Sequence, residues 1–400
     1  MSPDTAPVIY PARRAVEHAV SLPGVRPLRL FPVLWPLRQV EIIAFVDDEQ
    51  AYEVIDHFLV RGIAEGQISR ITDLAWFLAL PEALVRRCVD FLRTIGHLQV
   101  AGDRLLLTDL GIRSWQAGIR YEAKESRQHL LFERRTGWPL PRRYYQGDVA
   151  VLPDLNVPDE RLRDRSRFLG MFDATPWRPD VVHALTARPD RAEYNLPGTL
   201  SDLRVLGERD VYLPVYLVET VGHGVFVYTA LAEEPDRLFA DVVTQIGTVG
   251  DLIEAEGLLE PRQIWTEWLT KSSVGPGVLK KGGSGVWRIV LPAASFGPAR
   301  GQLAVTRVGS YELRRHHFAQ LWCDDAEVRR RAVRERALGL SRSRGVDSAD
   351  DLRERVAPVA RALQVPAPSL DELRTFAARS GRTREVARLE ALAAAASRRP

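Results

Sequence analysis

One stretch of the chain decides the local fold: Pro81-Glu-Ala-Leu-Val-Arg-Arg-Cys-Val-Asp-Phe-Leu-Arg-Thr-Ile-Gly-His-Leu-Gln-Val-Ala-Gly-Asp-Arg-Leu-Leu-Leu-Thr108. As far as Ile95 the apolar residues recur every three or four positions, which is typical of a helix with one buried face. Gly96 is suited to end that helix. Two short runs follow, His97–Val100 and Arg104–Thr108, and the Gly102 turn between them predicts a β-hairpin.

Three more helices are expected around this stretch. The first runs from Asp47 to Glu65, with Asp47 or Asp48 as N-cap. Thr72 is expected to cap a second helix, whose apolar residues are Leu74, Ala75, Phe77 and Leu78. After the hairpin, Leu107-Thr108-Asp109-Leu110-Gly111 leads into a fourth helix that contains Ile112 and Trp115.

This order of three helices, a hairpin and a closing Leu-Thr-x-x-Gly resembles the winged-helix domains of bacterial transcription regulators. The resemblance covers residues 47–118, and we expect the domain to span 47–120. In that family the third helix enters the major groove of DNA and the hairpin, or wing, contacts the backbone. The resemblance thus implies a DNA-binding set made of Arg70, Thr72, Arg86, Arg87, Arg93 and Arg104.

The charge pattern of the third helix leaves a protein contact open. Asp90 lies among its arginines, where it repels phosphate and is spaced to pair with Arg86. Many winged helices in large bacterial proteins bind only other proteins. Cys88 and His97 are interpreted as packing residues, since free cysteine is commonly buried.

Residues 1–46 form an N-terminal extension with an apolar strand or strap. Pro32 and Pro36 interrupt any helix there, so an extended edge strand or strap is expected. The side chains of Leu30, Phe31, Val33, Leu34 and Trp35 are too apolar to stay in water and must pack either on this chain or on another one. On the second interpretation the partner-binding residues are Leu30, Phe31, Leu34 and Trp35.

The middle of the chain predicts a connector and an α+β domain. Residues 121–150 mix arginines, aromatic rings and prolines, which indicates a connector, although the same mixture can stack on unpaired bases or form a protein interface. In 151–323 we expect a hairpin of strands 211–219 and 225–231, then a helix over 234–246 and strands near 286–291 and 303–307.

Residues 324–400 are expected to form a helical tail rich in Arg and Ala. Capping patterns place helix starts near Ala349 and Leu370, and a last helix runs from Thr383 to about Ser397. The densest basic cluster in the chain lies between Arg329 and Arg336. Its interspersed glutamates favour a solvated helix over a nucleic-acid patch.

Composition indicates a cytoplasmic bacterial protein. The net charge of +3 is nearly balanced, so attraction to nucleic acid requires local clusters. Arginine supplies almost all the positive charge, which we interpret as the coding bias of a GC-rich bacterium. Cys88 and Cys323 are expected to be free thiols of a reducing cytoplasm. No segment approaches the roughly 20 apolar residues of a membrane span.

No catalytic motif is recognised, so we expect no catalytic residues, no metal and no cofactor. The glycine-rich stretch 275–285 lacks the order of a phosphate-binding loop, and the adjacent pair His316–His317 has no further histidine or cysteine at ligand spacing. Enzymatic activity stays open, since side chains can converge in space without a sequence motif.

Two functions are therefore predicted. The first is a non-enzymatic, regulator-like bacterial protein that binds duplex DNA through its winged helix and a ligand or partner through its α+β region. The second is a non-catalytic interaction subunit of a multi-protein bacterial machine, such as an antiviral phage-defence or DNA-processing complex. The expected partners are duplex DNA and a protein partner or second copy, without a membrane.

Overall fold

A computed structural model describes residues 9–145, 149–158, 167–171, 175–197, 200–229, 234–255 and 260–396. The fold is α+β, as predicted. The chain divides into two compact units, each built from segments distant in sequence. Unit 1 comprises Met1–Trp35, Gly147–Phe172 and Tyr212–Pro400, and unit 2 comprises Pro36–Gln146 and Asp173–Val211. The domains predicted from the sequence are continuous ranges, whereas each unit combines segments from two or three of them.

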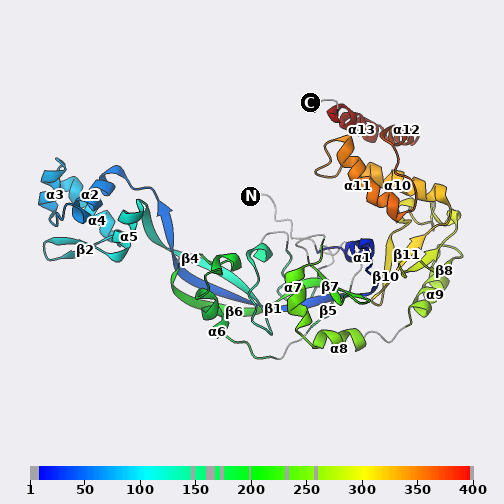
Figure 1. Ribbon diagram of the computed structural model, residues 1–400, viewed down its shortest axis with the longest axis horizontal. Helices are drawn as coiled ribbons and strands as arrows, with labels where there is room; N and C mark the ends of the chain where they lie inside the picture. The colour runs from blue at the N-terminus through cyan, green and yellow to red at the C-terminus, as the bar shows by residue number, and fades with distance from the viewer. Residues whose placement is uncertain are drawn as a thin grey trace. The chain divides into compact units, whose positions relative to one another are not determined.

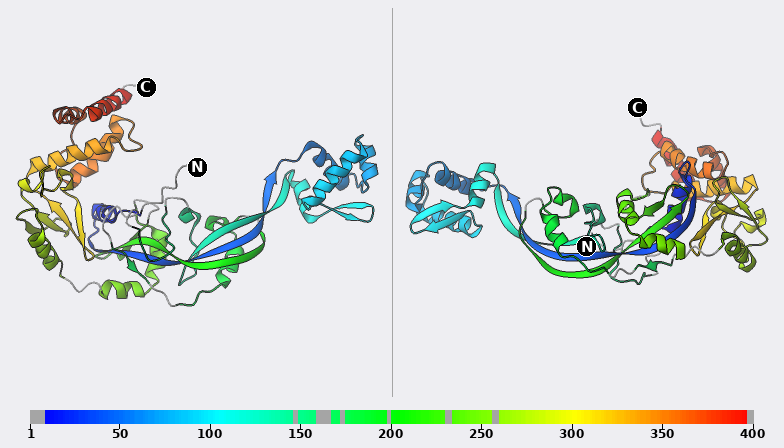
Figure 2. Two further views of the ribbon diagram at one scale, coloured as in Figure 1. Left: turned by 180° about the vertical axis from the view of Figure 1, so that it is seen from behind. Right: turned by 60° about the horizontal axis from the view of Figure 1, so that its bottom comes forward.

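The largest sheet has the strand order β4-β1-β6-β7, with β5 beside β1. Its strands are β1 (Pro27–Gln50), β4 (Arg120–Glu133), β5 (Leu169–Gly170), β6 (Ser201–Thr220) and β7 (Val225–Tyr228). In unit 2, β1 and β4 lie side by side (Figure 2), and their antiparallel register extends from the pair Leu37–Glu133 to the pair Gln50–Arg120. β1 therefore lies inside the sheet, which corrects the expectation of an edge strand.

The apolar strap is part of the core of unit 1. Leu30, Phe31, Leu34 and Trp35 are each at most 1% exposed. The ring of Phe31 stacks on His316 at 4.7 Å between centroids, and Trp35 meets Phe239 edge to face at 5.5 Å. Of the two interpretations, packing within this chain is therefore confirmed, and the interpretation of the four side chains as partner-binding residues is wrong.

The β6–β7 hairpin agrees with its predicted pairing, since Glu219 faces Val225 and Tyr216 faces Tyr228. The end of the predicted second strand, residues 230 and 231, lies outside the described residues. The predicted helix over 234–246 is present as α7 (Arg237–Thr244). Its N-cap is Asp236, whose carboxylate accepts from the Phe239 N–H at 3.1 Å.

A second sheet of unit 1 has the order β10-β11-β9-β8, drawn in yellow in Figure 1. Its strands are β8 (Val278–Lys281), β9 (Trp287–Val290), β10 (Tyr311–Arg314) and β11 (His317–Trp322). The other helices of unit 1 that precede the tail are α1 (Ala12–Ser21), α8 (Thr248–Ala255) and α9 (Pro261–Lys271). The strand predicted near 303–307 is wrong, because Val305–Arg307 forms a short 3-10 helix.

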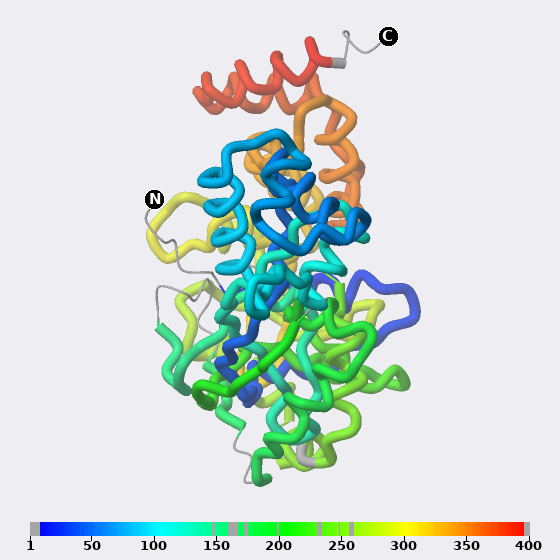
Figure 3. Tube along the Cα trace, turned by 90° about the vertical axis from the view of Figure 1, so that its left-hand side faces the viewer, coloured from blue at the N-terminus to red at the C-terminus, as the bar shows by residue number. Residues whose placement is uncertain are grey.

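The tail is helical as predicted, and its helices lie one beside another in Figure 3. They are α10 (Ala326–Leu340), α11 (Ala349–Ala362), α12 (Leu370–Arg379) and α13 (Thr383–Ala396). Both predicted capping boxes are present, with Ser348 and Ser369 each bonded to the third residue of its helix. In the basic cluster, Arg330 and Arg334 pair with Glu327, which favours the solvated-helix interpretation.

An inserted module, residues 51–119, follows β1 and precedes β4 in unit 2. Its elements are α2 (Val54–Ala64), α3 (Ile71–Phe77), α4 (Glu82–Thr94), β2 (Leu98–Ala101), β3 (Arg104–Leu107) and α5 (Asp109–Ala117). The expected order of three helices, a hairpin and a fourth helix is present. Two expected caps are wrong. Asp47 and Asp48 belong to strand β1, where they pair with residues of β4, and the N-cap of α3 is Arg70 rather than Thr72.

The inserted module has its own core. Eight of its apolar side chains are at most 2% exposed: Leu59, Val60, Leu74, Val85, Val89, Leu92, Leu98 and Leu105. Thr108 caps α5 by accepting from the Gly111 N–H at 3.1 Å. A side chain on Gly111 would collide with the His97 carbonyl oxygen, so this position requires glycine. The Leu-Thr-x-x-Gly pattern thus has a steric cause.

The remaining helix of unit 2, α6 (Asp180–Thr186), covers the β1–β4 ladder. Val182 and Leu185 of α6 pack with Val40 of β1 and Phe132 of β4. The predicted connector, residues 121–150, begins with a strand of the large sheet, because β4 occupies its residues up to Glu133. Within it, Arg134 pairs with Asp210 at 2.9 Å. None of the helices in the described part of the chain combines the length and apolar character of a membrane span.

Candidate nucleic-acid interface

α4 carries the largest group of predicted DNA-binding residues. Val85, Val89 and Leu92 face the core of the inserted module, which leaves Arg86, Arg87 and Arg93 exposed on the outer side. The helix begins after Pro81, carries Glu82 in its first turn and ends before Gly96, whose φ of +78° suits glycine. The sequence pattern therefore sets which face of α4 meets water.

The ion pair on α4 differs from the expected one. Arg86 pairs with Glu82, one turn earlier, at 2.5 Å, and not with Asp90. Asp90 is exposed, and its backbone carbonyl accepts from the Thr94 hydroxyl at 2.8 Å. Both spacings are i,i+4, so sequence alone does not distinguish them. Exposed pairs of this kind contribute little stability, and Arg86 can exchange its partner at small cost.

The hairpin contributes Arg104, and the start of α3 contributes Arg70 and Thr72. Arg104 is exposed at the beginning of β3. Arg70 reaches the hairpin turn and pairs with Asp103 at 2.9 Å, with both side chains more than half exposed. The Thr72 hydroxyl contacts the carboxylate of Asp73 at 3.4 Å. All six predicted DNA-binding residues are thus exposed on the inserted module, and three of them contact acidic neighbours.

The exposed charges of the inserted module are balanced overall. Its exposed acidic residues are Glu53, Glu65, Asp73, Glu82, Asp90, Asp103 and Asp109, and its exposed basic residues are Arg61, Arg70, Arg86, Arg87, Arg93, Arg104 and Arg113. A surface without net charge attracts phosphate only through locally unpaired cations. An arginine without an acidic partner is therefore the one that can bind a phosphate without first losing an ion pair.

Four of the seven arginines have an acidic partner. Arg61, Arg70, Arg86 and Arg113 pair with Glu65, Asp103, Glu82 and Asp47, in that order. Within the residues that the structure describes, Arg87, Arg93 and Arg104 form no ion pair. These three belong to α4 and to the start of β3, the elements that the sequence singled out.

A closed polar cluster lies inside the inserted module. His97 is fully buried, and its Nε2 lies 2.7 Å from the Tyr121 carbonyl oxygen of β4. Burial lowers the pKa of His97, because the imidazolium would lose its water. Burial likewise raises the pKa of Asp56, which is 4% exposed, and that of the nearby Cys88 thiol. Because His97 and Asp56 are closed to solvent, the cluster joins the module to β4 and offers no substrate site.

Sequence reasoning missed a pair of exposed aromatic residues at the end of α3. Trp76 is 84% exposed and Phe77 is 57% exposed. Phe77 was expected on the buried stripe, but the buried side of α3 consists of Leu74 and Ala75. On a helix of only seven residues, a one-residue error in phase moves a side chain from the core to the surface.

An apolar hollow of about 430 Å³ is formed by α2, β3 and α5. Its lining is Ile63, Ala64, Gln67, Ser69, Leu105, Leu106, Leu107, Ile112 and Trp115. Leu106 is 43% exposed and Ile112 is 39% exposed, so apolar surface is open to solvent there. The hollow uses neither α3 nor α4, and it is therefore separate from the arginines described above.

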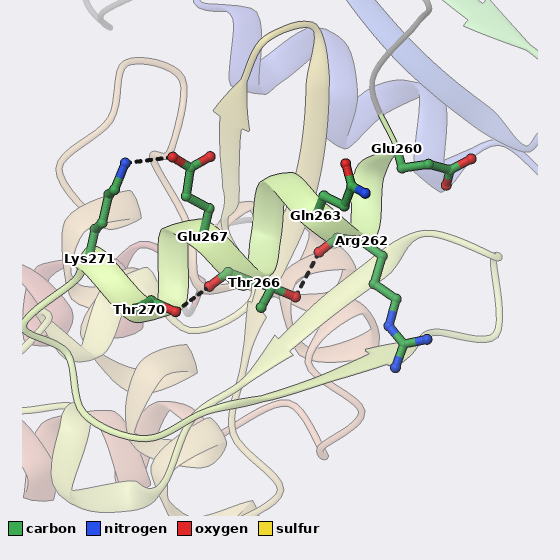
Figure 4. A pocket seen from close by; sticks show the side chains of 7 residues that line it. All are labelled: Glu260, Arg262, Gln263, Thr266, Glu267, Thr270 and Lys271. Atoms are coloured by element: carbon green, nitrogen blue, oxygen red, sulfur yellow. Dashed lines mark hydrogen bonds and ion pairs between the residues drawn. The ribbon is translucent and has the colours of Figure 1, made fainter.

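Unit 1 has a hollow of about 620 Å³ along α9, shown in Figure 4. The side chains that line it come from that helix and from Glu260, its N-cap. Lys271 pairs with Glu267 at 2.5 Å, and the Thr266 and Thr270 hydroxyls donate to carbonyls one turn earlier. All seven residues of the lining belong to one helix and its N-cap, so no second element of the described chain brings polar groups toward a ligand there.

Comparison with protein-family models, with curated proteins and with solved structures finds no match. The described residues contain no group of three or more His, Cys, Asp or Glu side chains placed to hold a metal ion. His316 and His317 belong to a β-hairpin rather than a helix, with His316 in its turn and His317 at the start of β11. The arginines and aromatic rings of the inserted module are therefore the candidate site.

Proposed function

We propose that the inserted module is a winged helix that docks the protein on duplex DNA. The observation that carries this proposal is the selective pairing of its arginines. Arg87, Arg93 and Arg104 form no ion pair within the described part of the chain, and all three lie on the elements that would meet DNA. The other exposed arginines of the module are neutralised by acidic partners.

In this arrangement α4 enters the major groove and the β2–β3 hairpin follows the backbone. Arg87 and Arg93 would contact the DNA from α4, and Arg104 would bind a phosphate from the hairpin. Because the exposed charge of the module is balanced, only these few cations drive association. We therefore expect modest affinity, and a slope of log K against log salt of about −3, one unit for each of the three arginines.

The remainder of the protein has a non-enzymatic role in this proposal. Unit 1 has sheets and a helical tail with their own core, which includes Trp265, Ile289, Leu321 and Leu352. A regulator-like protein couples such a region, which binds a ligand or partner, to its DNA-binding module. The tail residues Arg329, Arg330 and Arg334 are bonded within the chain and are not assigned to DNA.

The experiment is fluorescence anisotropy of the full chain on random duplex DNA at two salt concentrations. A triple variant, Arg87→Gln, Arg93→Gln and Arg104→Gln, removes the three unpaired cations. The slope of log K against log salt should become shallower by about one unit for each arginine–phosphate pair that the variant removes. Circular dichroism checks that the variant is folded, which is expected because all three side chains are exposed.

The matched control is Arg61→Gln, since Arg61 is also exposed on the module but pairs with Glu65. It should bind duplex DNA like the wild type. If the triple variant keeps the wild-type affinity and salt slope, the assignment of these arginines to DNA is wrong. If the wild type does not bind duplex DNA at low salt, the whole proposal is wrong.

The apolar hollow between α2, β3 and α5 favours a second function, a protein contact within a multi-protein complex. Its volume and its open Leu106 and Ile112 suit an apolar side chain of a partner. Under this proposal the isolated chain binds an environment-sensitive hydrophobic dye, and the pair Leu106→Glu and Ile112→Glu lowers that signal. A wild-type chain that binds no dye would contradict it. For DNA binding the neutral pair Leu106→Gln and Ile112→Gln is used, since a carboxylate at position 106 would lie on β3 two residues from Arg104, and binding should be unchanged in this neutral variant.

A further inference from the structure

The exposed aromatic pair on α3 has no partner inside the described part of its module. Trp76 is the most exposed of the large apolar side chains described, at 84%, and Phe77 follows it in sequence at 57%. Most large aromatic rings are buried, because each removes a large apolar area from water. Two adjacent exposed rings therefore indicate a contact with another molecule.

The side chains one turn before Trp76 on α3 are polar, and Phe77 beside it is a second exposed ring. On the same face of α3 lie Thr72 and Asp73, one turn earlier, and both are exposed. The centre of a protein interface is instead a contiguous apolar patch, in which neighbouring contacts exclude water from the central ring. A flat ring among polar groups is suited to stacking, which needs one π-face and tolerates a wet rim.

The pair also lies beside the proposed DNA-binding helix. α3 packs against α4, and the short turn between them runs from Phe77 to Glu82. That turn is held by the bond from the Leu80 N–H to the Ala75 carbonyl oxygen at 3.0 Å. The aromatic rings and the unpaired Arg87 and Arg93 thus belong to one compact helix pair.

We propose that the inserted module recognises DNA in which a duplex adjoins unpaired bases, with Trp76 and Phe77 stacking on those bases. This inference rests on the proposed DNA-binding function and adds the class of substrate. The arginines of α4 and the hairpin hold the duplex backbone. The rings hold bases that a continuous duplex would keep stacked within itself, so an end, a fork or a gap is preferred over intact duplex.

The test uses the full chain and three fluorescent DNAs that share one duplex: a blunt form, one with an oligothymidine overhang, and one with an abasic overhang of equal length. The two overhangs carry equal phosphate charge, so a difference between them reports the bases alone. Stacking on an aromatic ring should tighten binding about tenfold for the base-bearing overhang over the abasic one. The abasic form should bind like the blunt duplex apart from its extra charge.

Variants assign the effect to the rings. Trp76→Ala should remove most of the preference for the base-bearing overhang over the abasic one, whereas Trp76→Phe should keep most of it. Val54→Ala is the matched control, since Val54 is 70% exposed on α2 of the same module. None of these changes touches the core, so all variants should fold.

The outcomes separate this inference from the proposed function. Equal binding of base-bearing and abasic overhangs, with arginine-dependent duplex binding, overturns the inference alone. A preference for unpaired bases that Trp76→Ala and Phe77→Ala both leave intact also overturns it and leaves the rings as a protein contact. A wild type that binds none of the three DNAs overturns both proposals.

Discussion

Two aromatic segments of this chain have opposite environments. Phe31 and Trp35 in β1 are at most 1% exposed and contact rings of unit 1. Trp76 and Phe77 at the end of α3 are 84% and 57% exposed. In the sequence the first segment is the longer apolar run, and the pattern leaves open whether it packs on this chain or on a partner. The second contains two rings in a short amphipathic helix, and Phe77 was assigned to the core.

The difference shows that a long apolar run is poor evidence for an interface. Such a run usually forms a strand buried within its own chain, as β1 does. A better indicator is a large ring on a helix whose inner face is already filled. In α3, Leu74 and Ala75 fill that face, which leaves no place for the two aromatic residues.

The largest expected difference between the two segments is in the free energy of unfolding after a tryptophan is removed. Trp35→Ala should lower the free energy of unfolding by about 3–5 kcal/mol, because it leaves a cavity beside Phe239. Urea unfolding of the full chain, followed by circular dichroism, measures it. Trp76→Ala is the matched control and should change stability by no more than about 0.5 kcal/mol. Similar losses for the two variants would break the comparison.

A smaller effect concerns the buried polar cluster of the inserted module. Burial raises the pKa of Asp56, so the folded state binds this proton more tightly than the unfolded state. Its stabilising contribution is complete below the unfolded pKa of about 3.9 and is lost as the pH rises through the folded value. Asp56→Asn should therefore stabilise the module at neutral pH and converge with the wild type in acid.

His97 acts in the opposite direction in the same experiment. Burial lowers its pKa, so its contribution is present above the unfolded pKa of about 6.5 and is lost as the pH falls through the folded value. Urea midpoints measured across this pH range for the wild type and Asp56→Asn separate the two groups. A destabilised Asp56→Asn at neutral pH would show that the Asp56 carboxylate is stabilising instead.

The smallest predicted effect is in the turn that follows the aromatic pair. Ala79 has a φ of +52°, a conformation that strains any residue with a Cβ. Ala79→Gly relieves this strain but costs more backbone entropy on folding, so we expect the free energy of unfolding to rise by about 0.5–1 kcal/mol. Ala387→Gly is the contrasting control, because Ala387 is exposed within helix α13 and glycine should destabilise it. A loss of stability for Ala79→Gly would contradict the assigned strain.

Local sequence patterns predicted those elements whose signals are themselves local. The capping boxes at Ser348 and Ser369 placed the starts of α11 and α12, and the Gly102 turn placed the β2–β3 hairpin. Each of these depends on bonds between residues only a few positions apart, so the sequence carries the information directly.

Errors occurred where the deciding contact is distant in sequence or where two neighbours compete. Asp47 and Asp48 look like helix caps, but they pair with Ala123 and Glu122 of β4. Glu82 and Asp90 are each four residues from Arg86, and only the folded helix shows that Arg86 forms its ion pair with Glu82. The six DNA-binding candidates were correctly expected on the surface, but the identity of the three arginines without an ion pair needed coordinates.

The ladder register has an evolutionary consequence. Gln50 and Arg120, which flank the inserted module, are direct partners in the β1–β4 ladder. Directly opposed residues of antiparallel strands have Cα atoms about 4.5–5.5 Å apart, so the ends of the insertion are as close as those of a tight turn. A domain with such neighbouring ends can be exchanged as one unit while the strands that carry it keep their register, provided that the contact of His97 with Tyr121 is replaced. Residues 51–119 thus have the properties of a cassette, which a lineage could replace while keeping the strands and the rest of the chain.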